Sequence, residues 1–161
     1  MTEQEESFVH FVSCITWLNN AWRLLNTIHT QSENPLIGPA FRFALIEYCK
    51  PYKTSYGITK PRFMLDTRYI PKECLPLHER IISSRDQIHA HSDLTVMDAK
   101  LHVHEFMGQR YTLIPQNKIN GTEELSNLQE IVALIEATLD NMYIEEKVLE
   151  NSPKEVEQIE I

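Results

Sequence analysis

The chain has 161 residues, 42% of them hydrophobic, which suffices for one domain with an apolar core that needs neither disulfides nor a structural metal. Four glycines disfavour an all-β fold, and three scattered cysteines exclude a disulfide framework. The acidic first residues and the absence of a long apolar run argue against a secretory signal and a membrane span. We therefore expect a soluble, cytoplasmic protein without membrane association.

The formal net charge of −8 is unevenly distributed along the sequence. Residues 136–161 contain eight acids and two lysines, whereas residues 41–91 contain nine basic residues and five acids. The second segment therefore carries a net charge of +4, which is compatible with a phosphate-bearing partner. An ordinary solvated surface accounts for the same distribution. Nucleic-acid binding through bulk charge alone is disfavoured.

The first predicted element is a long helix over residues 3–31. Its apolar residues recur at spacings of three and four, the period of an α-helix: Phe8, Phe11, Val12, Ile15, Leu18, Trp22 and Leu25. Thr2 and Glu5 form the pattern of a capping box at its start. We expect the three cysteines to be buried or half-buried thiols, and Trp17, Trp22 and Tyr48 to belong to the core or to an interface.

A second helix is predicted over residues 35–49 and ends before Pro51. Residues 50–71 combine Pro and Gly with a mixed pattern, which indicates a long ordered loop, and such loops are often functional. A third helix is predicted from Pro71 or Pro76 to about Asp93, with an apolar face formed by Leu77, Ile81, Ile82 and Ile88.

Apolar and polar residues alternate over residues 100–106, and the short segment 111–114 follows after Gly108. This pattern predicts a small β-hairpin. A last long helix is predicted over residues 122–149. The fold class that follows is mainly α: a helical bundle with two long terminal helices and a small β-hairpin insert. We expect residues 1–150 to form a single domain and the acidic residues 151–161 to form a flexible tail.

The segment Arg85-Asp86-Gln87-Ile88-His89-Ala90-His91-Ser92-Asp93 is the best candidate for a working site. It resembles the motif of the HEPN superfamily, an Arg and a polar residue followed after a short spacing by a His. Among the members of that superfamily, the residue pattern of this segment is most similar to the abortive-infection and toxin-like branch. The flanks, residues 41–48 and the Lys50-Pro51-Tyr52 step, are similar to that branch as well.

The resemblance implies a HEPN-like helical domain with metal-independent endoribonuclease activity, no cofactor, and a composite site at a homodimer interface. RNA would be the substrate, and the setting would be antiviral defence or a toxin–antitoxin pair with an antitoxin protein. Arg85 would hold the phosphate, His91 would act as general acid or base, and Asp86 would orient them. His89, Arg42 and Lys50 are further candidates for substrate binding.

Helix geometry limits how Arg85 and His91 act together. Six positions separate them, which is about 9 Å along an ideal helix and about 120° around it. His89, four positions after Arg85, lies on the same face of an ideal helix. Either the helix ends or distorts near His91, or a second copy of the chain completes the site. The resemblance favours the second copy and selects His91.

Two alternatives remain at the sequence level. The first is a non-catalytic helical interaction module in which the same segment forms the dimer face. The second is a metal site that combines His89 or His91 with His102 and His104 of the hairpin, which would share one face of a strand. An enzyme loses activity on single conservative substitutions without losing its fold, whereas an interaction module loses dimerisation.

Overall fold

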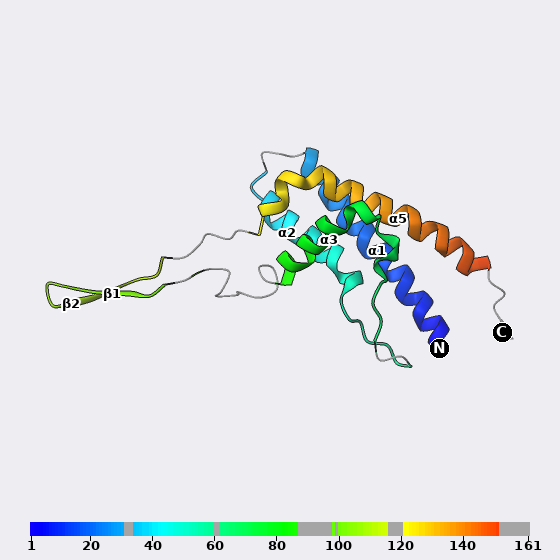
Figure 1. The fold of residues 1–161 in the computed structure, drawn as a ribbon, viewed down its shortest axis with the longest axis horizontal. Coiled ribbons are helices and arrows are strands. Elements are labelled where there is room, and N and C mark those ends of the chain that lie inside the picture. The colour runs from blue at the N-terminus through cyan, green and yellow to red at the C-terminus, as the bar shows by residue number, and fades with distance from the viewer. Residues whose placement is uncertain (31–33, 60–61, 87–97, 99, 116–120, 152–161) are drawn as a thin grey trace.

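The computed structural model describes residues 1–30, 34–59, 62–86, 98, 100–115 and 121–151. The α-helices are α1 (Glu3–Thr30), α2 (Ile37–Cys49), α3 (Leu75–Ser84) and α5 (Leu128–Asn151). The strands β1 (His102–Phe106) and β2 (Gln109–Leu113) form one antiparallel sheet. The expected fold class, a mainly helical bundle with two long terminal helices and a small hairpin, is confirmed (Figure 1). No helix in these ranges combines the length and the apolar character needed to span a bilayer.

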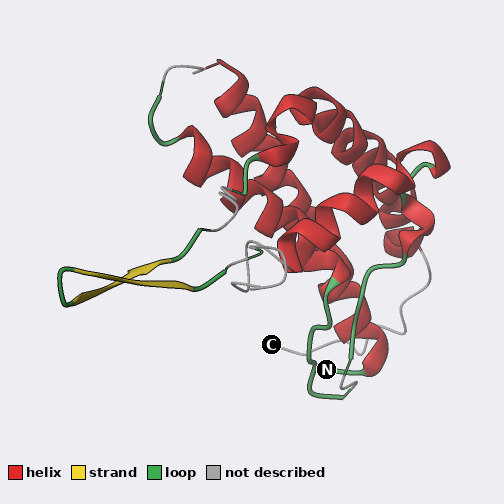
Figure 2. Cartoon of the chain, turned by 60° about the vertical axis from the view of Figure 1, so that its left-hand side comes forward, coloured by secondary structure: helices red, strands yellow, loops and turns green. Residues whose placement is uncertain are grey.

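Helices α1 and α5 lie side by side and run in opposite directions. Three side-chain hydrogen bonds set their register: Gln129 bonds His29, the indole N–H of Trp22 donates to Glu136, and Asn19 donates to Tyr143. Helices α2 and α3 pack next to this pair, and together the helices form the body of the molecule (Figure 2). The two longest helices of the sequence therefore act as the frame on which the shorter ones are held.

The core is built from the apolar residues whose spacing predicted the helices. Helix α1 buries Phe11, Cys14, Ile15, Leu18, Ala21, Leu25 and Ile28, and helix α5 buries Leu128, Ile131, Leu134, Ile135, Leu139 and Met142. Each fully buried large side chain contributes about 1.5–3 kcal/mol relative to an exposed one. Cys14 and Cys49 are buried and Cys74 is half-buried, and Tyr48 is fully buried while Trp17 and Trp22 pack on the core as partly buried residues. These expectations are confirmed.

The start of α1 has the predicted capping box. The backbone N–H of Glu5 donates to Oγ1 of Thr2 at 3.3 Å, and the backbone N of Thr2 donates to Oε2 of Glu5 at 2.6 Å. This reciprocal pair satisfies donors that have no partner within the helix.

The segment between α2 and α3 is an ordered loop, as expected, and it contains short 3₁₀ turns: η1 (Lys50–Tyr52), η2 (Thr67–Tyr69) and η3 (Lys72–Cys74). An isolated bridge joins Ser55 to Phe63. The carboxylate of Glu6 on α1 accepts hydrogen bonds from the backbone N–H groups of Ile58 and Thr59 and from the Thr59 hydroxyl. This buried carboxylate holds the tip of the loop against the first turn of α1.

The observed helix ends differ from the predicted ones at three places. Helix α2 begins at Ile37 rather than near Pro35, because Asn34 accepts a hydrogen bond from the backbone of Leu36 in a turn that precedes the helix. Residues 123–127 form the 3₁₀ turn η5, so the last α-helix begins at Leu128 rather than at Thr122. Helix α3 ends at Ser84, and the two residues after it continue in a wider helical turn. The remainder of the predicted third helix, residues 87–93, lies outside the described residues.

The hairpin extends away from the helical body (Figure 1). All ten residues of β1 and β2 are exposed. Met107 and Gly108 connect the strands, with φ values of +52° and +72°. Two consecutive residues in the left-handed region form the turn type whose twist matches that of the flanking strands, which explains the tight hairpin.

Candidate functional site

Arg85 and Asp86 of the motif lie at the end of α3, in the wider turn that follows Ser84. Nη1 of Arg85 lies 3.0 Å from Oδ1 of Asp86, so the two neighbours form an ion pair. The predicted role of Asp86 in orienting Arg85 therefore has a geometric basis.

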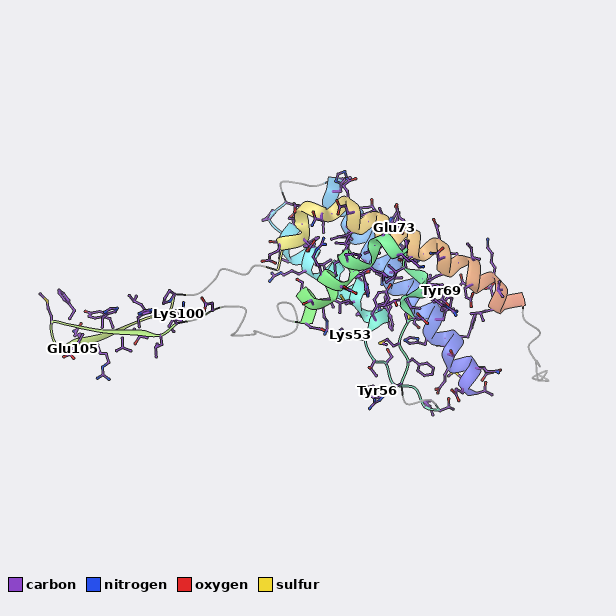
Figure 3. The ribbon with its side chains drawn as sticks, in the orientation of Figure 1. Lys53, Tyr56, Tyr69, Glu73, Lys100 and Glu105 are labelled. Carbon is purple, nitrogen blue, oxygen red and sulfur yellow. The ribbon has the colours of Figure 1, made fainter. Side chains whose placement is uncertain are left out.

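Lys53 joins this pair from another part of the sequence. Turn η1 ends α2 and directs Lys53 to the end of α3, where its Nζ lies 2.5 Å from Oδ2 of Asp86 (Figure 3). The hydrogen bond from Lys53 lowers the pKa of the Asp86 carboxyl, and the bond from Arg85 adds to this. One carboxylate thus lies between two cations, and the group of three, which we call the Lys53–Asp86–Arg85 cluster, carries one net positive charge.

The cluster is accessible to a ligand. The side chains of Arg85, Asp86 and Lys53 are 29%, 42% and 34% exposed. A guanidinium and an ammonium that are held in place and partly exposed are suited to binding a phosphate, because both donate charge-assisted hydrogen bonds.

Cys49 lies beneath the cluster as the last residue of α2. Its Sγ is 4.0 Å from the backbone oxygen of Ile81, which connects the end of α2 to α3. Burial raises the pKa of this thiol to about 12, and the nearby charges of Arg85 and Lys53 offset only part of that increase. A neutral thiol is a poor nucleophile, so Cys49 has a packing role at this site.

The two predicted substrate-binding cations on α2 and η1 are placed differently from the cluster. Lys50 is ion-paired with Glu47, a buried carboxylate of α2. Arg42 is exposed on α2, seven positions before Cys49 and thus about 10 Å away along the helix axis. The structure therefore places Lys53, which was not selected from the sequence, close to Arg85 through their shared partner Asp86.

The histidines of the motif, His89 and His91, lie outside the described residues. His102 and His104 lie on one face of β1, with ring centroids 6.4 Å apart and nearly parallel rings. Within the part of the chain that the structure describes, no group of three or more His, Cys, Asp or Glu residues is arranged to hold a metal ion.

A buried aromatic group that was not anticipated from the sequence joins α2, η1 and α3. The hydroxyl of Tyr48 on α2 lies 2.8 Å from Nδ1 of His78 on α3, and the ring of Tyr52 lies edge-on to His78 with centroids 4.5 Å apart. Burial lowers the pKa of His78, so this imidazole is held in its neutral form. The group fixes α3 against α2 and η1, the elements that carry Arg85 and Lys53.

Comparison of the chain with protein-family models, with curated proteins and with solved structures finds no match.

Proposed function

We propose that the protein is a metal-independent endoribonuclease of the HEPN type, in which the Lys53–Asp86–Arg85 cluster binds the RNA backbone and His91 transfers protons. The observation that carries this proposal is the convergence of Lys53 and Arg85 on Asp86 at the end of α3. That position is where the motif begins, and two partly exposed cations there match the need of a phosphodiester for charge-assisted donors.

The chemistry follows from the substrate. RNA carries a nucleophile beside each phosphate, the 2′-hydroxyl. His91 of one chain would accept the 2′-hydroxyl proton as the oxygen attacks phosphorus, and an imidazolium would return a proton to the leaving 5′-oxygen. The products are a 2′,3′-cyclic phosphate and a 5′-hydroxyl. Arg85 and Lys53 would stabilise the charge that develops on the phosphate oxygens.

A homodimer is part of this proposal, because Arg85 and His91 diverge on one ideal helix. A two-fold axis beside the motif would bring Arg85 of one copy close to His91 of the other. By the resemblance, the reaction would serve defence or a toxin–antitoxin pair with a protein antitoxin.

The test is cleavage of a labelled RNA oligonucleotide by the purified protein in the presence of a chelator. We expect cleavage, no cleavage of the 2′-deoxy oligonucleotide, and losses of about 10²-fold or more in Arg85→Ala and His91→Ala. Arg80→Ala is the matched control, since Arg80 is an exposed arginine on the same helix that pairs with Glu124. Full activity in Arg85→Ala, or activity that the chelator abolishes, would contradict the proposal.

Mixing the two inactive variants tests the composite site. Exchange of subunits between Arg85→Ala and His91→Ala would create dimers with one intact pair, and part of the activity should return. If the protein does not cleave RNA and every motif variant abolishes dimerisation, the non-catalytic interaction module is the better description.

A further inference from the structure

The hairpin has two chemically different faces. Strand register places His104 opposite Tyr111, His102 opposite Leu113 and Phe106 opposite Gln109, and these pairs share one face. Glu105 and Arg110 lie opposite each other on the other face. The first face, which we call the aromatic face, therefore carries three rings on β1 and one on β2 and contains neither an acid nor a lysine or arginine.

The described part of the chain leaves this surface uncovered. On the aromatic face Phe106, Tyr111 and Leu113 are 63%, 47% and 59% exposed, and Met107 in the adjoining turn is 87% exposed. A two-stranded hairpin by itself is marginally stable in water, and three or more strands or a packing partner are needed for independent stability. An exposed apolar patch of several hundred Å² marks an interaction site.

We propose that the hairpin is a dimerisation arm whose aromatic face packs against the same face of a second copy of this chain. A two-fold contact is self-complementary, so it requires a surface that does not repel itself, and an uncharged aromatic face meets this requirement.

The distribution of charge supports a second copy at this end of the molecule. The acids of the first turn of α1, Glu3, Glu5 and Glu6, lie at the end of the body opposite the hairpin, beside the last turns of α5 with Glu145, Glu146 and Glu150 (Figure 1). Two copies that meet through their hairpins keep these acidic ends apart. Figure 3 shows Lys100 at the base of the hairpin and Glu105 near its tip, where Arg110 faces it across the strands.

The same observations disfavour a nucleic acid as the occupant of the aromatic face. Binding of a single strand combines stacking on aromatic rings with a positively charged groove along the backbone. Arg110 lies on the opposite face, and Lys100 is ion-paired with Asp98. The aromatic face thus provides rings without the cations that would hold phosphates.

The arm is proposed independently of the nuclease function. The ion pair of Arg80 with Glu124 ties α3 to η5, the two elements between which the hairpin lies in the sequence.

The first experiment measures the mass of the full chain by sedimentation over a range of concentrations. We expect a dimer for the natural sequence and an increase of about tenfold or more in the dimer dissociation constant for Phe106→Ser/Tyr111→Ser. The matched control is Leu101→Ser/Val103→Ser, which removes two exposed apolar side chains from the other face and should change that constant less than about threefold. Circular dichroism checks that the helical body is intact in each variant.

A second experiment places the contact directly. The background is Cys74→Ser, in which the other two cysteines are buried. A short bis-maleimide should cross-link two copies of the chain through the new cysteine of His104→Cys. It should not cross-link two copies of Val103→Cys. A monomer at all concentrations, equal effects of both double variants, or equal cross-linking at both positions would overturn the proposal. So would a monomer that binds single-stranded RNA through Phe106 and Tyr111. A dimer that fails to cleave RNA would refute the nuclease and leave the arm established.

Discussion

The Nζ atom of Lys53 lies 2.5 Å from Oδ2 of Asp86, although the two residues are 33 positions apart in the sequence. The contact joins the end of α2 to the end of α3 and places two cations, Lys53 and Arg85, on one carboxylate. It defines the candidate site more closely than the motif does, because it adds a residue that the motif does not contain.

A double-mutant cycle tests how strongly this pair couples. Both side chains are about one-third exposed or more, so water screens their attraction. We expect Lys53→Met and Asp86→Asn to show a coupling of only about 0.2–1 kcal/mol in the free energy of unfolding, measured with urea. In the cleavage assay, Lys53→Met should lower activity, because it removes a cation from the phosphate. A large coupling in stability with no effect on activity would assign the pair a structural role alone.

The lowered pKa of Asp86 predicts how the contribution of its carboxylate to the free energy of unfolding depends on pH. A carboxyl whose pKa is lower in the folded state stabilises that state above its unfolded pKa of about 3.9, and the contribution disappears as the pH falls through the lower folded value. Urea unfolding at pH 7 and near pH 3 should therefore give a smaller pH effect in Asp86→Asn than in the natural sequence. An identical pH effect in the two proteins would contradict this expectation.

The buried carboxylate of Glu6 should control the loop between α2 and α3. Glu6→Ala leaves the backbone N–H groups of Ile58 and Thr59 without this acceptor, at a cost of about 1–3 kcal/mol in unfolding free energy. Hydrogen exchange at the amides of Ile58 and Thr59 should accelerate at the same time. Ser7→Ala, at the neighbouring exposed position, is the control and should change neither quantity. Unchanged exchange in Glu6→Ala would show that other contacts hold the loop.

Protonation of the neutral, buried His78 should destabilise the protein in mild acid. Because burial lowers the pKa of His78 in the folded state, the unfolded chain binds more protons as the pH falls below about 6.5, and stability decreases from there downward. His78→Phe removes this dependence, although the lost bond to Tyr48 lowers stability at every pH. The urea midpoint of His78→Phe should therefore change less between pH 7.5 and 5.5 than the urea midpoint of the natural sequence. The exposed variant His29→Gln is the control and should keep the natural pH dependence.

The acidic tail is predicted to contribute little to the core. A chain that ends at Glu150 should keep a Tm within about 2 °C of that of the full chain. A chain that ends at Val148 also loses Leu149, which packs on the core, and should lose about 2–4 °C for each kcal/mol of lost burial. A large decrease in Tm for the longer of these two chains would show that residues after Glu150 pack on the body or on a partner.

The sequence by itself determined the helices and the hairpin. The spacing of Phe11, Ile15 and Leu18 in α1 is a local property, because residues three or four positions apart share a helix face whatever surrounds them. The capping box of Thr2 and Glu5 is equally local. The alternation that predicted β1 and β2, with Gly108 between them, depends only on neighbours in the chain. For the same reason the sequence could place Arg85 next to Asp86.

Only the tertiary structure decided what surrounds Arg85. The sequence indicated Arg42 and Lys50 as candidate cations for substrate binding and did not indicate Lys53, which turn η1 carries to Asp86, while Lys50 pairs with Glu47. No periodicity encodes that contact, because it depends on how α2 packs on α3 through Tyr48, Cys49 and His78. The exposure of both hairpin faces is also a tertiary property. An alternating pattern predicts which side chains of a strand share a face. Whether other parts of the protein pack on that face depends on elements far away in the chain.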